Sequence, residues 1–319
     1  MNKILITGAA GYIGSKLTAH FLNKGYRVTA FDNYFYNQQS LTEKVFHHKN
    51  CRFFEEDITD WSLNLYDAID SADVIIPLAA LVGAPLCDKY PDIAYRVNEE
   101  WFETLVKNID EQLVIYPNTN SGYGSTGNEI CTEETPCNPI SLYGQTKGAA
   151  EQILINNHAY SICFRLATVF GKSYRQRTDL LVNNLILEAM RKKHIDVFDG
   201  HFRRNYIHID DIVSAFDHAI NHAINMVGGV YNLGNDTINT TKLELVQKIC
   251  HKMNCSYDII TNRTDPDKRD YIVSSQKLYN TGYTPTRDLD YGIVEISDLY
   301  AAIWNELQDP DFADKCRNY

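Results

Sequence analysis

Tyr143 and Lys147 are the residues whose types and spacing most directly suggest chemistry. They are four positions apart, so a helix would place both side chains on one face. A tyrosine hydroxyl ordinarily has a pKa of about 10, and a nearby lysine ammonium stabilises its phenolate form. Such a pair could remove the proton of an alcohol, and Thr119 could hold the same oxygen by a hydrogen bond. We therefore predict that Thr119, Tyr143 and Lys147 form a catalytic set that oxidises a hydroxyl group.

The spacing alone is not specific, because Tyr12 and Lys16 repeat it. Thr119 distinguishes the second pair, since it follows a predicted strand at 113–116. The carboxyl edge of an open parallel sheet is where such proteins bind their ligands.

A glycine-rich loop indicates the ligand that accepts the hydride. Gly8, Gly11 and Gly14 recur at intervals of three between a predicted strand and a predicted helix. Glycines allow a tight turn and let backbone N–H groups approach a pyrophosphate at the start of the helix. We expect Tyr12 and Ile13 of this loop to contact the dinucleotide as well.

An acidic residue after the second predicted strand favours NAD over NADP. Asp32 follows Gly14 by 18 positions, where a carboxylate can accept hydrogen bonds from both ribose hydroxyls and would repel a 2′-phosphate. Asn33 is expected beside it, and Asp57 with Ile58 is expected to reach the adenine.

The pattern of apolar runs predicts an α/β fold with a doubly wound parallel sheet of the Rossmann type and a smaller C-terminal substrate-binding lobe. Residues 1–170 are expected to form the NAD-binding domain, with 205–237 returning to it, and 171–204 with 238–319 to form the lobe. Strands are predicted at 3–7, 27–31, 52–55, 74–78, 113–116, 161–166 and 206–209, and helices at 12–24, 97–108, 143–156 and 180–192.

The composition is that of a globular protein, and we expect no nucleic-acid partner. Hydrophobic residues make up 44% of the 319 positions, and the net charge of −11 argues against binding a phosphate backbone. No apolar run approaches the ~18 residues of a membrane span, and the first strand leaves no room for a signal peptide, so we expect a cytoplasmic protein. The eight cysteines and the histidines show no ligand spacing, so we assign no metal and expect reduced thiols.

These motifs together resemble the extended short-chain dehydrogenase/reductase family, and within it the nucleotide-sugar epimerases and dehydratases. The resemblance covers nearly the whole chain. It implies that Leu78, Ala79 and Ala80 line the cofactor, that Asn98 supports the site near Lys147, and that the substrate is a nucleotide-diphosphate sugar. The substrate residues that it implies are Asn120, Ser121, Thr168, Asn183, Arg204 and Arg269, with the two arginines facing the diphosphate.

Departures from the family pattern narrow the reaction. In the similar 4,6-dehydratases, Asp and Glu follow the catalytic Thr and carry out elimination, whereas this chain has Asn120 and Ser121. Neither can act as that acid/base pair at neutral pH. The cysteine that the reductases and 3,5-epimerases place near this strand end is missing too. Thr168 and Asn205 replace the usual Asn and Asp, which leaves the sugar and base open.

The segments 79–86, 117–124 and 202–206 are most similar to enzymes that oxidise C4 of GDP-heptoses, with UDP-hexose 4-epimerases next. Both remove hydride from C4; a dehydrogenase releases the ketone, and an epimerase reduces it again from the other face. A non-catalytic dinucleotide-sensing protein is a further alternative. The family resemblance also implies a homodimer that pairs the 97–108 helix and the Tyr143 helix.

Overall fold

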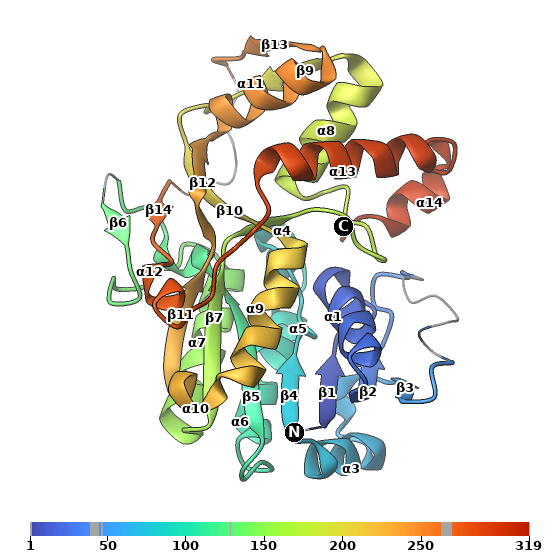
Figure 1. The fold of residues 1–319 in the computed structure, drawn as a ribbon, viewed down its shortest axis with the longest axis vertical. Coiled ribbons are helices and arrows are strands. Elements are labelled where there is room, and N and C mark those ends of the chain that lie inside the picture. Colours follow the sequence, from blue (N-terminus) through green and yellow to red (C-terminus); the bar gives the residue numbers. More distant parts are fainter. Residues whose placement is uncertain (1, 39–44, 46, 128, 263–269, 319) are drawn as a thin grey trace.

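A seven-stranded parallel sheet forms the centre of the molecule (Figure 1). The computed structural model describes residues 2–38, 45, 47–127, 129–262 and 270–318. The sheet order is β11-β7-β5-β4-β1-β2-β3. In that order the strands span Gly229–Leu233, Ser161–Leu166, Leu113–Thr119, Val74–Pro77, Lys3–Thr7, Arg27–Asp32 and Cys51–Glu55. The order reverses direction beside β1, so the predicted doubly wound Rossmann arrangement is confirmed.

Alternate residues of each strand enter two different cores, because successive side chains point to opposite faces of a sheet. Ile4 and Ile6 of β1 pack with α1 (Tyr12–Asn23) and α9 (Ile209–Asn221). Leu5, between them, packs on the other face, where α3 (Leu63–Ser71), α6 (Trp101–Leu105) and α7 (Leu142–Asn157) contribute apolar side chains. The central strands are therefore buried on both sides, as an all-parallel sheet requires.

The remaining elements of the sheet half are short. They are α4 (Ala84–Lys89), α5 (Pro91–Tyr95), α10 (Ala223–Met226) and α12 (Gln276–Tyr279), with 3₁₀ turns at Ile58–Asp60 and Asn120–Tyr123. Two small sheets complete this half. One contains β8 (Thr168–Phe170), β10 (Arg203–His208) and β12 (Asn235–Thr241), and the other pairs β6 (Ile130–Cys131) with β14 (Ile272–Val273).

A smaller lobe lies over the carboxyl ends of the large sheet (Figure 1). It contains α8 (Leu181–Lys192), β9 (His194–Val197), α11 (Lys242–Met253), β13 (Ser256–Ile259), α13 (Leu289–Ala302), a 3₁₀ turn at Glu306–Gln308 and α14 (Pro310–Lys315). These helices share a separate apolar core. We propose that residues 1–170 and 205–237 form the NAD-binding domain, with β11 as the strand by which the later segment returns to the sheet. The segment 238–319 does not lie wholly in the lobe, because α12 packs against the core of the large sheet.

Three predicted elements have bounds that differ from the structure by more than one residue. The strand that begins at Leu113 continues through Thr119, because Pro117 to Thr119 keep pairing with β7 although their side chains are less apolar. The 97–108 helix is instead a π-helical turn at Arg96–Glu100 followed by α6, which ends at Leu105. The strand predicted at 206–209 runs from Arg203 to His208, since its first residues pair with β12.

No helix among the described residues is long and apolar enough to cross a membrane.

Candidate active site

A cavity of about 1030 Å³ lies between the carboxyl edge of the sheet and the smaller lobe. Its wall includes the glycine loop, the ends of β2, β4 and β5, the start of α7, and residues of the lobe. This position agrees with the rule that open α/β sheets bind ligands where the strand order reverses.

The glycine loop has the shape of a phosphate cradle. Gly8 has φ of +67°, and a Cβ there would lie 2.6 Å from the backbone nitrogen of Ala79. A Cβ on Gly14 would lie 2.1 Å from the carbonyl oxygen of Gly8. Gly11 caps α1 without a side-chain hydrogen bond. The helix start therefore presents backbone N–H groups and its positive dipole end to the cavity, and these residues fit a dinucleotide pyrophosphate.

Asp32 ends β2 beside this cradle and is 7% exposed. Its carboxylate accepts hydrogen bonds from the backbone nitrogens of Ala10 at 2.9 Å and Tyr34 at 2.8 Å. Burial raises the pKa of Asp32, although these hydrogen bonds oppose the effect. The acid faces the cavity and fits a ribose diol.

Asn33, Asp57 and Ile58 line the next part of the cavity wall. The Asn33 side-chain amide donates to Asp57 at 2.8 Å, and Thr59 donates to the other carboxylate oxygen. Burial alone would raise the pKa of Asp57, but the hydrogen bonds from Thr59 and Asn33 outweigh it and lower the pKa. Asp57 is thus a fixed acceptor at the position predicted for adenine.

Leu78, Ala79 and Ala80 follow β4 along the cavity floor. Asn98, in contrast, is fully buried behind that floor and does not line the cavity. Its side chain accepts from the Leu81 nitrogen at 2.9 Å and donates to the Thr146 hydroxyl at 3.3 Å. Asn98 therefore ties the β4 loop to α7 and acts on the site through these neighbours.

Thr119, Tyr143 and Lys147 all line the same cavity. Thr119 is the last residue of β5, and its hydroxyl donates to the Ser121 hydroxyl at 2.9 Å. Ser141 caps α7 by accepting from the Gly144 nitrogen, so the helix begins where Tyr143 and Lys147 face the end of β5. The tertiary fold thus places Thr119 in the same cavity as Tyr143 and Lys147, which come later in the chain.

Lys147 is 3% exposed, and its ammonium lies 4.2 Å from the centre of the Tyr116 ring. Burial lowers the pKa of Lys147 to about 7. Among the described residues no carboxylate forms an ion pair with it. A buried cation without a counter-ion stabilises a nearby anion strongly, because little solvent screens the interaction. Lys147 is thus suited to stabilising a phenolate on Tyr143.

A buried polar network holds the end of β5. Glu151, one helical turn beyond Lys147, is 1% exposed and pairs with Arg165 of β7 through two guanidinium nitrogens at 2.7 and 3.1 Å. Asn118 donates to Glu151 at 2.6 Å and accepts from the backbone nitrogen of Thr119 at 2.7 Å. The orientation of Thr119 therefore depends on an ion pair behind the cavity.

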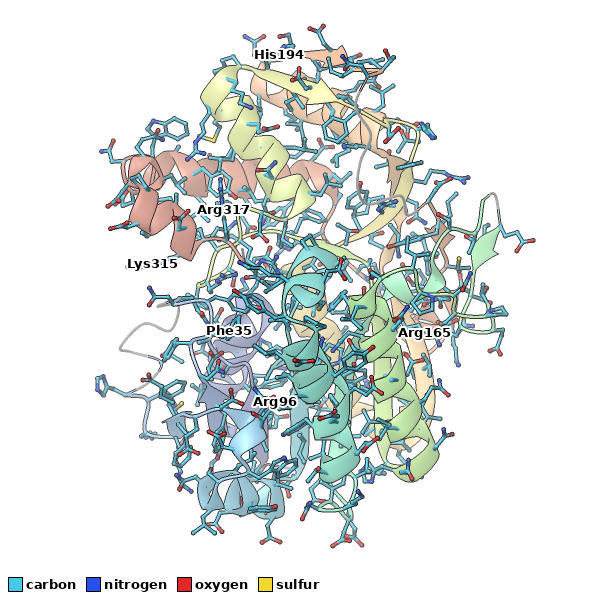
Figure 2. The ribbon with its side chains drawn as sticks, turned by 180° about the vertical axis from the view of Figure 1, so that it is seen from behind. Phe35, Arg96, Arg165, His194, Lys315 and Arg317 are labelled. Carbon is cyan, nitrogen blue, oxygen red and sulfur yellow. The ribbon has the colours of Figure 1, made fainter. Side chains whose placement is uncertain are left out.

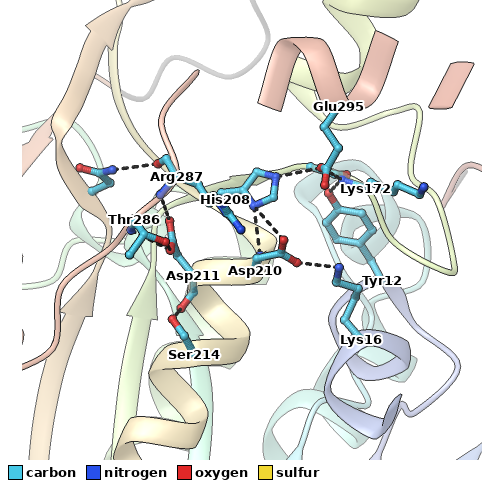
Figure 3. Close-up of polar contacts among 12 residues, drawn as sticks. Tyr12, Lys16, Lys172, His208, Asp210, Asp211, Ser214, Thr286, Arg287 and Glu295 are labelled. Atoms are coloured by element: carbon cyan, nitrogen blue, oxygen red, sulfur yellow. Dashed lines mark hydrogen bonds and ion pairs between the residues drawn. The ribbon is translucent and has the colours of Figure 1, made fainter. Parts of the chain in front are cut away.

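The competing pair Tyr12 and Lys16 makes contacts outside the catalytic chemistry (Figure 3). The Tyr12 hydroxyl donates to the Gly171 carbonyl at 2.7 Å, and burial raises the pKa of Tyr12. Lys16 pairs with Asp210 of α9 at 2.6 Å. These contacts attach α1 to neighbouring segments.

His208, Asp210 and Glu295 come together in that region, although their sequence spacing gave no sign of a ligand group. One ligand atom from each lies within 4.8 Å of the others. His208 nevertheless uses both ring nitrogens, one with Glu295 at 2.9 Å and one to accept from the Asp210 backbone nitrogen. Lys16 already neutralises Asp210. The three side chains therefore form a polar contact between the start of α9 and α13 (Figure 3).

Only some of the predicted substrate residues line the cavity. Ser121, Thr168 and Arg204 line the cavity. Asn120 does not; it is 1% exposed, and its side-chain amide has no hydrogen-bond partner among the described residues. Arg269 lies outside the described residues.

Asn183 was expected near the nucleotide of the substrate. It is fully buried and does not line the cavity; its side chain accepts from the Gly171 nitrogen and donates to the Arg177 carbonyl. It thereby fixes the segment that enters the lobe, and its neighbour Asn184 lines the cavity instead.

Sequence reasoning missed Tyr36, Arg175, Lys242 and Tyr271 in the cavity wall. Each comes from a loop or element end without a recognisable motif, so only the tertiary structure places it there. The sole sequence signal was the basic character of 172–177, which holds Arg175.

The fold and the cavity define an oxidoreductase of the Rossmann class with a nucleotide-sized ligand site. The model of the NAD dependent epimerase/dehydratase family matches residues 4–234. The chain belongs to this family; it is an enzyme, and its cofactor is NAD.

Known proteins resemble the chain over nearly its whole length. The low-salt glycan biosynthesis protein Agl12 of Haloferax volcanii is 28% identical over 313 residues, covering 93% of this chain and 98% of that protein. The dTDP-glucose 4,6-dehydratase of Bacillus anthracis, solved with NAD, has a TM-score of 0.81 and 26% identity, covering 95% and 97% of the two chains. The UDP-glucuronic acid 4-epimerase of Bacillus cereus, solved with UDP-glucuronic acid and NAD, has a TM-score of 0.79 and 26% identity, covering 94% and 99%.

Proposed function

We propose that this enzyme oxidises the C4 hydroxyl of a nucleotide-diphosphate sugar and reduces the resulting ketone from its other face, so that the net reaction is 4-epimerisation. The observation that carries the proposal is the set of residues at the end of β5 and at the start of α7. Lys147 supplies a buried cation beside Tyr143, whereas Asn120 and Ser121 provide no acid/base pair for elimination. Such a site favours hydride chemistry without loss of water.

The chain's own residues would divide the proton chemistry among them. Thr119 and Ser121 hold the sugar hydroxyl, and Tyr143 accepts its proton as the base. Lys147 stabilises the phenolate through its charge. The bound NAD supplies the hydride acceptor. In the second half, the ketone carbon would take back the hydride on its other face while Tyr143 returns the proton to the same oxygen.

Relatives support reduction of the ketone within the site. The Bacillus cereus 4-epimerase was solved with UDP-glucuronic acid and NAD, and UDP-glucuronate 4-epimerase 3 of Arabidopsis thaliana is 26% identical over 340 residues. A single NAD serves both halves of such a cycle. We propose a UDP- or GDP-sugar as the substrate, with Arg204 contacting its diphosphate, because a guanidinium fork matches that dianion.

A GDP-heptose 4-dehydrogenase is the second candidate, favoured by the similarity of segments 79–86, 117–124 and 202–206 to such enzymes. It shares the first half of the cycle but releases the ketone.

The test is a panel of UDP-, GDP- and dTDP-sugars incubated with enzyme and NAD, followed by NMR of the products and absorbance of NADH. Epimerisation predicts the C4 isomer without net NADH, and a dehydrogenase predicts one NADH for each ketone. A 4-keto-6-deoxy product would contradict the proposal, because it requires elimination.

Tyr143→Phe tests the base within the same assay. We expect turnover to fall about 10²- to 10⁴-fold, the usual contribution of a general base. Tyr66→Phe, at a partly exposed tyrosine on α3, is the matched control. Undiminished turnover by Tyr143→Phe would refute the mechanism.

A further inference from the structure

Arg175 lies in the segment that leaves the sheet half and enters the smaller lobe. It lines the cavity and is only 4% exposed. One guanidinium nitrogen donates to the carbonyl of Arg317 at 2.8 Å, and the guanidinium carbon lies 5.5 Å from the centre of the Tyr36 ring. The chain end at Arg317 thus anchors the side chain from the lobe, beside α14 (Figure 2).

Among the described residues, no carboxylate forms an ion pair with Arg175. Its Nε is buried and has no hydrogen-bond partner in the same part of the chain. Arg177, two positions later, contrasts with it because a bidentate contact to Asp179 neutralises its charge. A buried, unpaired cation is costly unless an anion accompanies it.

Burial, together with the neighbouring charge of Arg177, lowers the pKa of Arg175 to about 10. The guanidinium consequently remains protonated near neutral pH, and the missing partner is an anion.

The neighbours of Arg175 indicate which anionic group of a ligand it would bind. Its charge acts on Asp32, whose carboxylate is already engaged by Ala10, Tyr34 and Gln38. Tyr36 belongs to the same stretch after β2. Arg175 therefore faces the dinucleotide half of the cavity, near the glycine loop that fits a pyrophosphate.

We propose that Arg175 binds the pyrophosphate of NAD from the side of the smaller lobe, opposite the backbone N–H groups of the glycine loop. The pyrophosphate is then held between the two halves of the molecule, with the Arg317 carbonyl fixing the guanidinium. A fork of donors suits phosphate oxygens better than a single ammonium. Retention of NAD consequently depends on a residue outside the Rossmann motif.

The test measures binding rather than turnover, so it does not depend on the proposed reaction. NAD⁺, ADP-ribose and adenosine are titrated calorimetrically into protein stripped of nucleotide, using wild type, Arg175→Met and Arg175→Lys. UDP and GDP are titrated separately to report on a substrate diphosphate. Lys172→Met, at an exposed lysine of the same segment, is the matched control.

Removing a charged hydrogen-bonding partner should weaken NAD⁺ and ADP-ribose about 10- to 100-fold in Arg175→Met. Arg175→Lys should fall between that variant and wild type, and adenosine should bind all of them equally. Because the lysine variant keeps the charge, it preserves the test if Arg175→Met does not fold. Unchanged NAD⁺ affinity in either folded variant would overturn the proposal. A loss confined to UDP or GDP would also overturn it and assign Arg175 to the substrate.

Discussion

Replacing Lys147 with Met should make the enzyme inactive and also change how its stability depends on pH. Burial lowers the pKa of Lys147 from 10.5 to about 7. The folded protein therefore binds fewer protons at this position than the unfolded chain does between these two values. In that window wild-type stability rises with pH, whereas below pH 7 the full cost of the buried ammonium is present.

The size of the effect follows from the two pKa values. As the pH rises from 6.5 to 9.5, Lys147 loses its proton in the folded protein. This deprotonation should raise the free energy of unfolding of wild type, relative to Lys147→Met, by about 3 kcal/mol. Tyrosines and thiols titrate in the same pH range, so the stability of Lys147→Met is subtracted at each pH to isolate the contribution of Lys147. Methionine is an unbranched apolar side chain of similar size to lysine, so it is a conservative replacement at this buried position.

The assay is urea unfolding, followed by circular dichroism at half-unit steps of pH, on protein stripped of nucleotide. Lys107→Met, at an exposed lysine, controls for removing one lysine from the chain. A stability difference between wild type and Lys147→Met that stays constant over this range would refute the reasoning. It would mean that burial does not lower the pKa of Lys147 and that the ammonium persists in the folded protein throughout this range.

Three further outcomes are expected. Glu151→Gln should lower the free energy of unfolding by about 3–5 kcal/mol, because it leaves the buried Arg165 cation unpaired; thermal and urea unfolding would measure this, and a loss below 1 kcal/mol would contradict it. Gly14→Ala should abolish NAD binding in calorimetry, since its Cβ would lie 2.1 Å from the Gly8 carbonyl oxygen, whereas Gly148→Ala, where a Cβ meets open space, should bind normally. The protein should sediment as a homodimer of 36.5 kDa chains through α6 and α7; a monomeric mass would refute the pairing.

The strongest sequence predictions concern segments in which local chemistry and fold agree. Position 14 of the glycine loop needs a residue without a side chain, since a Cβ there would lie 2.1 Å from the carbonyl oxygen of Gly8. Strand β1 likewise follows from a short apolar run buried on both faces. Such features are visible in a sequence because the constraint acts on neighbouring residues.

The weaker predictions concern residues whose role depends on distant partners. Asn183 follows a family pattern, yet it bonds to Gly171 and Arg177 rather than facing the cavity. The extension of β5 to Thr119 depends on pairing with β7 and on the buried Glu151. Neither partner can be read from the residues adjacent in sequence.

By itself, the sequence determined the fold class, the dinucleotide loop and the types of residue able to move a proton and a hydride. Those features depend on local backbone geometry and on side-chain chemistry, which the residue types carry with them. Only the tertiary structure decided that Lys147 loses its solvent and that Arg175 reaches the cofactor half of the cavity. Burial and charge pairing arise between segments far apart in the chain, so the environment of Tyr143, Lys147 and Arg175 exists only in the folded protein.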